Sequence, residues 1–250
     1  MAGFKAAFAN ELYKLMKRKK VITAAVLSIV AVLVGQAAVT AIQMGFGLRM
    51  AGGGDFPLVV LPLLTYTLLP MFAAFVAIDM FSGEFATNTM KLTLTRPVSR
   101  FGVFCAKTAS LAVFIIGNLL FVMVLSMIAG FLFNTSPGGI GEIVRVVCAY
   151  VATFLPVFVF SLLVVLLANF FRSGAAVFFL SLLIYAAFHL AGIMFSSYSS
   201  FLITSMFDWY TLWISETFNA AKIIREFLIM AGMGTMLFAA GFYLFDRKDL

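Results

Sequence analysis

The uncharged stretch VITAAVLSIVAVLVGQAAVTAI runs from Val21 to Ile42. A helix needs about 20 predominantly apolar residues to cross a hydrocarbon layer about 30 Å thick. This stretch reaches that length without one charged side chain. It therefore predicts a membrane-spanning helix.

The composition of the whole chain agrees with this prediction. Of its 250 residues 64% are apolar and 11% are charged, and the mean hydropathy is +1.12. Soluble domains are about 45–50% apolar and about 25% charged. The chain is therefore expected to be an integral membrane protein. Its net charge of +7 does not favour a nucleic-acid partner, because the basic residues flank apolar runs, where they set membrane orientation.

Five further stretches are long and apolar enough to span a membrane. They cover residues 57–81, 108–133, 147–170, 175–195 and 227–245. The connections between them are short, so no soluble domain is left over. The sequence thus predicts an all-α integral membrane protein with six transmembrane helices, forming one domain over residues 1–250.

The basic residues indicate which way the chain is inserted. If the N-terminus is inside, only Arg49, Arg145, Lys222 and Arg225 of the 17 Lys and Arg residues fall on outer segments. The remaining 13 fall inside. Because Lys and Arg collect on cytoplasmic loops, both termini are predicted to be cytoplasmic.

Residues 1–20 have the pattern of an amphipathic helix on the membrane surface. An apolar stripe at helical spacing is surrounded by six basic residues, and it is made by Phe4, Phe8, Leu12 and Leu15. Such a helix lies in the interface with its apolar face toward the lipid. We therefore expect an interfacial helix that turns into the first span.

The polar stretch EFATNTMKLTLTRPVSR, from Glu84 to Arg100, separates the second and third spans. Ser82 is a candidate N-cap, and Glu84 would then stand in the first turn, where a negative charge favours the helix dipole. Pro97 would end this helix. The pattern predicts a short helix on the cytoplasmic surface, between two spans.

Two roles for this short helix stay open on the residues alone. It could carry force from a soluble motor into the bilayer, or it could rest on anionic lipid. Ser99 is expected to cap the following span. Lys107, further along that span, is expected to snorkel its ammonium to the membrane surface.

The sequence lacks the groups that intramembrane chemistry needs. His189 is its one histidine, and no His, Cys or carboxylate cluster predicts a metal site. No nucleophile elbow or phosphate-binding loop is present either. His189 and Asn118 are polar residues within spans, where such groups can mark a substrate path, although packing is the simpler role. Cys105 and Cys148 are predicted near opposite faces and therefore unpaired.

Two further features concern the shape of the spans. Pro62, Pro70 and Pro156 each remove a backbone donor and are predicted kink points, for packing or for movement. The outer stretch 196–226 carries Tyr198, Trp209, Tyr210 and Trp213, which are residue types enriched at the headgroups. We expect this stretch to form an interfacial or re-entrant helix rather than a free loop.

Four segments resemble the type-2 ATP-binding-cassette (ABC) transporter permeases. FANELYKLMKRKK before the first span is similar to their connecting helix. SGEFATNTMKLTLTRPVSRFGVFCAK, Ser82 to Lys107, is similar to their first cytoplasmic loop. FRSGAAVFF from Phe171 and the C-terminal DRKDL are similar to their second inner loop and their ending.

This resemblance implies the membrane half of a bacterial exporter in the cytoplasmic membrane. Two such permeases, identical or different, would pair with two ABC ATPase subunits, which would bind ATP and Mg²⁺, so this chain itself would hold no cofactor and catalyse nothing. The loop after the second span would be the coupling helix. Its ATPase contacts would be Ser82, Gly83, Glu84, Phe85, Thr87, Asn88, Thr89, Met90 and Lys91.

Two other functions remain as alternatives. The chain could be a membrane scaffold or signalling component that recruits a soluble partner through the same polar helix. It could also be a membrane-embedded enzyme, but the lack of clustered catalytic groups argues against this. Stimulated ATP hydrolysis by a co-purifying ATPase distinguishes transport from scaffolding.

Overall fold

The computed structural model describes residues 2–46, 52–84, 99–134, 139–171, 173–195, 201–215, 217 and 219–248. Every regular element in these ranges is helical. The predicted helix in the Glu84–Arg100 stretch falls mostly on residues 85–98, outside the described residues.

Six of the described helical segments are long and apolar enough to cross a membrane, as predicted. A first helix, α1 (Ala2–Met16), precedes them. The spans are α2 (Lys19–Phe46), a composite second span from Phe56 to Gly83, α7 (Arg100–Phe133), α8 (Ile140–Phe170), α9 (Gly174–Met194) and α11 (Ala220–Asp246).

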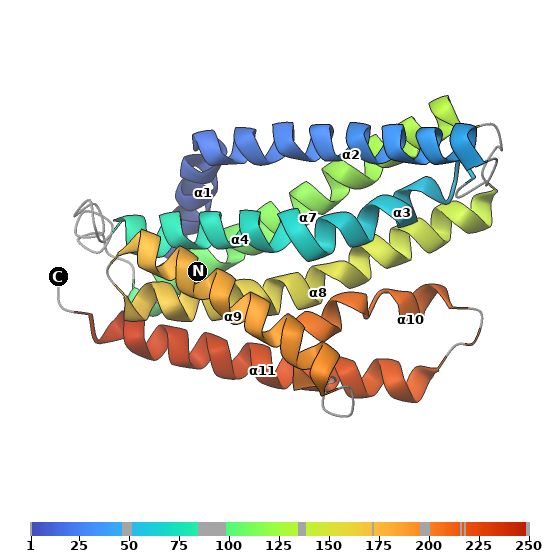
Figure 1. The fold of residues 1–250 in the computed structure, drawn as a ribbon. Helices are drawn as coiled ribbons and strands as arrows, with labels where there is room; N and C mark the ends of the chain where they lie inside the picture. Colours follow the sequence, from blue (N-terminus) through green and yellow to red (C-terminus); the bar gives the residue numbers. More distant parts are fainter. Residues whose placement is uncertain are drawn as a thin grey trace.

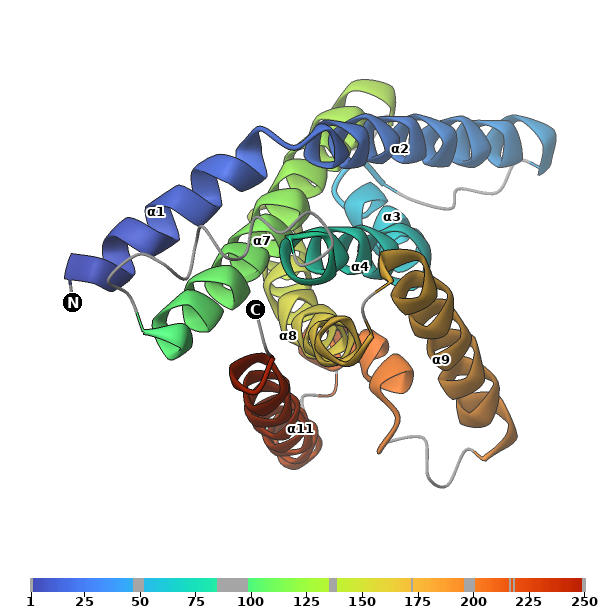
Figure 2. The same cartoon turned by 90° about the vertical axis from the view of Figure 1, so that its left-hand side faces the viewer.

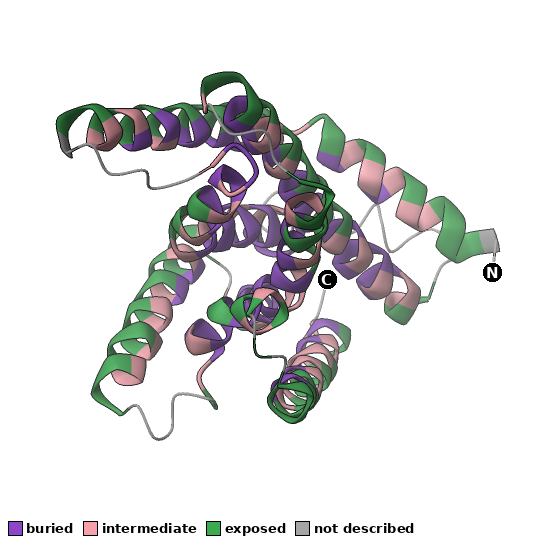
Figure 3. Ribbon diagram, turned by 90° about the vertical axis from the view of Figure 1, so that its right-hand side faces the viewer, coloured by how far each residue is buried: buried purple, intermediate pink, exposed green. Residues whose placement is uncertain are grey.

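The spans form one bundle, with α8 at its centre (Figure 1). We call one end of this bundle the basic end; there α2, α7 and α9 begin and α8 and α11 end. Buried residues concentrate on α8 and on the second span, whereas α2, α9 and α11 are exposed over most of their outward surfaces (Figure 3). Such apolar exposed surfaces suit helices that face lipid.

Helix α1 lies across the basic end, while α8 and α11 are seen nearly end-on in the same view (Figure 2). Of the predicted apolar stripe, Leu15 is buried and Leu12 is half-buried, and Phe4 and Phe8 stack at 6.3 Å between ring centroids. The buried side of α1 packs against α7. The stripe is therefore partly used for packing within the chain.

The second span is interrupted by two π-helical turns. It consists of α3 (Phe56–Leu63), η1 (Leu64–Leu68), α4 (Leu69–Ile78) and η2 (Asp79–Gly83). Pro70 has no N–H to donate to the carbonyl of Tyr66, four residues earlier. The hydroxyl of Tyr185 on α9 donates to that carbonyl at 2.6 Å. A neighbouring span therefore satisfies the group that the proline leaves free, as membrane helices require.

The described part of the outer stretch folds back along α8. It contains η4 (Ile203–Asp208) and the short α10 (Thr211–Ile214), both of which pack on α8 (Figure 1). Trp209 is buried against Trp213 and Phe227, with ring centroids 5.4 and 6.4 Å away. Burial of the Tyr210 hydroxyl, with help from the negative charge of Asp208, raises its pKa to about 12. The stretch is thus packed on the bundle and is not a free loop.

Gly130 marks a close approach at the end opposite to the basic end. A Cβ atom at this position of α7 would meet the carbonyl oxygen of Gly53 at 2.3 Å and the Cβ of Phe56 at 3.2 Å. The loop that enters the second span therefore lies directly against α7, and only a glycine leaves room for it.

We predict that Gly130→Ala lowers stability by about 1–3 kcal/mol, because the added methyl group has to push this backbone away. Gly117→Ala is the matched control on the same helix, since nothing lies within 4 Å of its Cβ position. The control should be neutral or slightly stabilising. Thermal unfolding in detergent micelles measures both, and equal midpoints would contradict the close approach.

Candidate functional site

Five charged residues meet at the basic end and form what we call the ion cluster. They come from α1, from the turn after it, from the end of the second span and from α7: Glu11, Lys14, Arg18, Glu84 and Lys107. Glu84 stands in the first turn of the predicted coupling helix, and it is the last described residue before position 99. The ion cluster therefore joins three parts of the chain where the polar segment begins.

Lys107 is the centre of the ion cluster. Its side chain is 0% exposed, and its ammonium lies 2.9 Å from Glu11 Oε2 and 2.6 Å from Glu84 Oε2. The expectation that Lys107 snorkels to the membrane surface is therefore wrong. Because α1 folds back across α7 and brings a carboxylate with it, the ammonium finds its partners inside the protein.

The second oxygens of the two carboxylates face the other cations. Lys14 lies 3.0 Å from Glu11 Oε1 and 3.5 Å from Glu84 Oε1, and Arg18 lies 3.2 Å from Glu84 Oε1. Three cations thus surround two buried carboxylates. Burial on its own would raise the pKa of Glu11, but the charges of Lys107 and Lys14 outweigh it and lower that pKa.

Asp79 connects the ion cluster to the start of α2. Asp79 on η2 lies 2.7 Å from the ammonium of Lys20 and 3.7 Å from the guanidinium of Arg18. Arg18 therefore connects Asp79 with Glu84. The positive residues before the first span, which the sequence analysis assigned to membrane orientation, also bind the end of the second span.

The local sequence explains why these groups meet. Glu11 and Leu15 are four residues apart, so they share one face of α1, and both are buried. On α7, Lys107 and Leu111 have the same spacing and are also buried. On α1 and on α7 the charged residue is therefore followed, one helical turn later, by a buried leucine. The two leucines place apolar packing next to the Glu11–Lys107 ion pair.

The predicted ATPase-contact residues fall into two groups. Ser82, Gly83 and Glu84 are described, whereas Phe85, Thr87, Asn88, Thr89, Met90 and Lys91 lie outside the described residues. Ser82 does not cap a new helix, contrary to expectation. It is buried inside η2, which continues the second span through Gly83, and Glu84 also has helical backbone angles.

Hydrogen bonds also hold the start of α7, which follows the polar segment. The Ser99 side chain accepts a hydrogen bond from the Gly102 amide at 3.1 Å, which confirms the predicted cap of α7. Arg100 donates to the backbone carbonyl of Asp246 at the end of α11, and Lys248 donates to that of Ala168 near the end of α8, at 3.2 Å. Basic side chains thus satisfy carbonyls at two helix C-termini.

The two predicted substrate-path residues do not come together. Asn118 is buried on α7, where its amide nitrogen lies 3.5 Å from Ser28 Oγ of α2. His189 is exposed on α9, with its ring 5.7 Å from that of Tyr66 and 6.3 Å from that of Tyr185. The contacts of Asn118 are those of a packing residue, and any substrate role of either residue stays a prediction.

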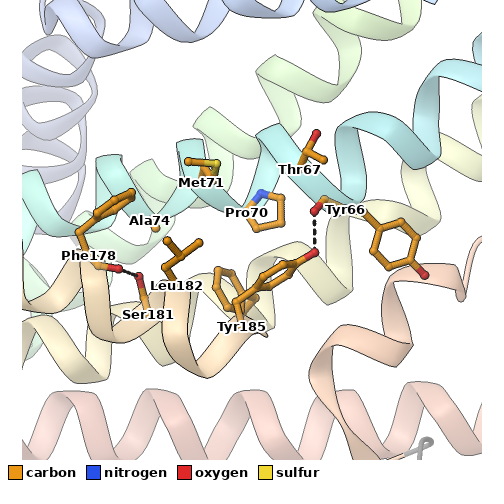
Figure 4. Close-up of a pocket in the computed structure, with 10 residues that line it drawn as sticks. Tyr66, Thr67, Pro70, Met71, Ala74, Phe178, Ser181, Leu182 and Tyr185 are labelled. Carbon is orange, nitrogen blue, oxygen red and sulfur yellow. Dashed lines mark hydrogen bonds between the residues drawn. The ribbon is translucent and has the colours of Figure 1, made fainter. Parts of the chain in front are cut away.

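A cavity of about 220 Å³ lies between α4, α8 and α9, next to the rings that His189 contacts (Figure 4). Its lining is mainly apolar and aromatic and includes Pro70, Phe160, Phe178 and Tyr185. Ser181 donates its hydroxyl to a carbonyl of its own helix at 2.8 Å. Such a lining suits an apolar group.

Two further features concern metal ligands and cysteines. Within the described ranges no group of three or more His, Cys, Asp or Glu side chains could hold a metal ion. Cys105 and Cys148 are both free thiols. The sequence analysis missed Glu11 and the true place of Lys107. A signal was present for Lys107, which is the one charge between Arg100 and the end of α7, but not for Glu11, which has Asn10 beside it and Lys14 three residues later.

Comparison with known families adds one finding. A family model described as "ABC-2 family transporter protein" matches residues 7–192. The matched range contains all five residues of the ion cluster and the cavity, while η4, α10 and α11 follow it. No curated protein matches the chain.

We predict that Lys107→Met destabilises the protein by about 3–5 kcal/mol, because it leaves two buried carboxylates without their shared cation. The triple variant Lys107→Met, Glu11→Gln, Glu84→Gln removes these charges together and should recover much of the loss. Lys222→Met, at an exposed lysine on α11, is the control for losing a surface charge. A single variant as stable as the parent in thermal unfolding would show that the ion cluster does not hold this end together.

Proposed function

The chain belongs to the ABC-2 transporter family, and on that premise we propose that it is the permease subunit of an ABC exporter. Two copies, or one copy and a related permease, would span the membrane together. Two separate ATPase subunits would bind ATP and Mg²⁺ and hydrolyse ATP. The chain itself would form the path and would not be an enzyme.

The ion cluster is the observation that carries this proposal. A coupling helix has to transmit a displacement to the spans, and Glu84 stands at the start of the predicted one. Its carboxylate is held by Lys107 of α7 and by Arg18 and Lys14 of the N-terminal segment. A movement of residues 85–98 would therefore act on two spans and on α1 at once.

The position of Glu84 changes the role that we propose for it. Its side chain is buried within the chain, so it would transmit force rather than form the main ATPase contact. The ATPase would then bind the residues that follow, among which Phe85 is the first. A non-transporting scaffold could dock a partner through the same residues, but it would have no need for a rigid connection to α7.

The proposed place is the cytoplasmic membrane of a bacterium, with the basic end and both termini in the cytoplasm. The turn before α2 and the first two residues of α2 carry four basic residues in succession, Lys17, Arg18, Lys19 and Lys20. Positive charge at one end of a bundle is the orientation signal of the positive-inside rule. The coupling segment and the ATPase would then be on the same side.

We predict that docking and transmission can be separated by mutation. Phe85→Glu should abolish co-purification of the cognate ABC ATPase, because it places a charge in the proposed contact. The triple variant Lys107→Met, Glu11→Gln, Glu84→Gln should still bind the ATPase. Its stimulation of the rate of ATP hydrolysis should be at least tenfold lower than that of the parent. Pull-down normalised to permease in the membrane, with ATP hydrolysis in nanodiscs, measures both.

Three outcomes would contradict parts of this proposal. If no ATPase co-purifies with the parent chain, the permease proposal fails. If the ATPase binds but hydrolysis is not stimulated and nothing is exported, the scaffold is favoured. If the triple variant hydrolyses and exports like the parent, the ion cluster does not transmit force. Lys222→Met serves again as the matched control.

We also predict the orientation of the bundle. Ile140 is 83% exposed at the start of α8, at the end opposite to the basic end. Ser173 is exposed before α9, at the basic end. In a chain without its two native cysteines, Ile140→Cys should react with an impermeant maleimide in intact cells, and Ser173→Cys should react only after lysis. The reverse pattern would contradict cytoplasmic termini.

A further inference from the structure

A second cavity, of about 170 Å³, lies between α2 and α4 near the basic end. Its apolar lining comes from Ala24 and Leu27 of α2 and from Phe72, Phe75 and Val76 of α4. We call this cavity the α2–α4 groove. Ala24, Phe72 and Val76 are buried at its base, whereas Leu27 is 41% exposed.

The α2–α4 groove contains two polar lining residues, and one of them is already used. Thr23 donates its hydroxyl to the carbonyl of Lys19 at 3.1 Å. The other is Lys20, at the end of the groove where α2 begins. The groove is therefore apolar along its length and has a positive charge at one end.

The ammonium of Lys20 can accept an additional anionic partner. It lies 2.7 Å from Asp79 and 5.3 Å from the centre of the Phe75 ring, and 45% of the side chain is exposed. An ammonium has three hydrogen-bond donors, and among the described residues Asp79 is the one carboxylate within ion-pair distance of it. The neighbouring cations Lys17 and Lys19 are exposed as well.

The depth of these groups in a membrane follows from their place on the first span. Lys19 and Lys20 start α2, so they lie at the level of the headgroups, while Ala24 and Leu27 lie within the hydrocarbon layer. A ligand that fits both parts has a negative headgroup and an apolar chain. Phospholipids with a net negative charge have both, and they surround such a protein in its membrane.

We propose that the α2–α4 groove binds one anionic phospholipid, with an acyl chain along Leu27 and Phe72 and the phosphate on Lys20. This site does not depend on the proposed transport function. Binding would place the phosphate beside Asp79, which also faces Arg18 of the ion cluster. The phosphate and Asp79 would therefore share the ammonium of Lys20 at one edge of the ion cluster.

The test is native mass spectrometry of the purified full chain, titrated with phosphatidylglycerol and with phosphatidylcholine. The parent should retain one phosphatidylglycerol more strongly than phosphatidylcholine. Lys20→Gln should weaken phosphatidylglycerol about fivefold, which is the effect of one lysine near an anionic headgroup. Lys20→Arg should keep the preference. Leu27→Trp, which fills the groove from its exposed side, should weaken both lipids.

Two controls separate this site from general charge attraction. Lys5→Gln removes an exposed lysine of α1 outside the groove and should leave lipid retention unchanged. Glycerophosphate, which has the phosphate but no acyl chain, should not displace the bound lipid at millimolar concentration. Thermal unfolding confirms that each variant is folded.

The proposal is overturned by any of four results. These are equal retention of both lipids by the parent, unchanged retention in the folded Lys20→Gln variant, an equal loss in Lys5→Gln, or displacement by glycerophosphate. The last result would mean that a phosphate site exists without a contribution from the groove.

Discussion

A lysine ammonium that is fully withdrawn from water needs oppositely charged partners inside the protein, and Lys107 imposes this requirement on the basic end. The cost of taking the charges out of water largely offsets their attraction. The ion cluster therefore adds little net stability compared with an apolar core of the same shape. Its contribution is to fix which segments meet. Lys107 can pair with both Glu11 and Glu84 only when α1, the second span and α7 are packed together as they are here. We take this positional role as a hypothesis that the recovery of the uncharged triple variant would support.

The second span shows a different way of handling polar groups in lipid. Its two π-helical turns and its prolines leave backbone carbonyls without their usual partners, and water is not present to replace them. Tyr185 donates its hydroxyl to the carbonyl of Tyr66, which Pro70 leaves free. Tyr150 of α8 also donates to this span, to the carbonyl of Pro57 at 3.1 Å, although no proline four residues later frees that carbonyl. The irregular span is thus held by hydroxyls from other spans. The cavity of Figure 4 lies beside the first of these contacts.

The sequence predicted what depends on local pattern. Six spans followed from apolar length, and the cap at Ser99 followed from a residue type beside a helix start. Contacts between distant segments were not predictable. Lys107 meets Glu11 across 96 residues, so its burial depends on how α1 folds back, which no local signal encodes. At Ser82 the local signal was misleading, because a serine and a glutamate two residues later resemble a helix start while the span continues through them. The contact of Trp209 with Phe227 of α11 was not predictable either, because the sequence does not place α11 beside it. The headgroup depth of Trp209 stays a prediction.

The hydrogen bonds of Arg100 have a consequence for how the protein is made. The carbonyl of Asp246, to which Arg100 donates, lies 146 residues further along the chain and is therefore synthesised later. At a synthesis rate of about 5–20 residues per second, that carbonyl leaves the ribosome on the order of ten seconds later. Until then the start of α7 lacks this anchor, although the first two spans have already been made. The residues of the ion cluster lie between positions 11 and 107, so they are made well before this carbonyl. The attachment of α11 to the start of α7 is therefore the late event in biogenesis, and chaperones or proteases at the membrane would first meet the basic end without α11.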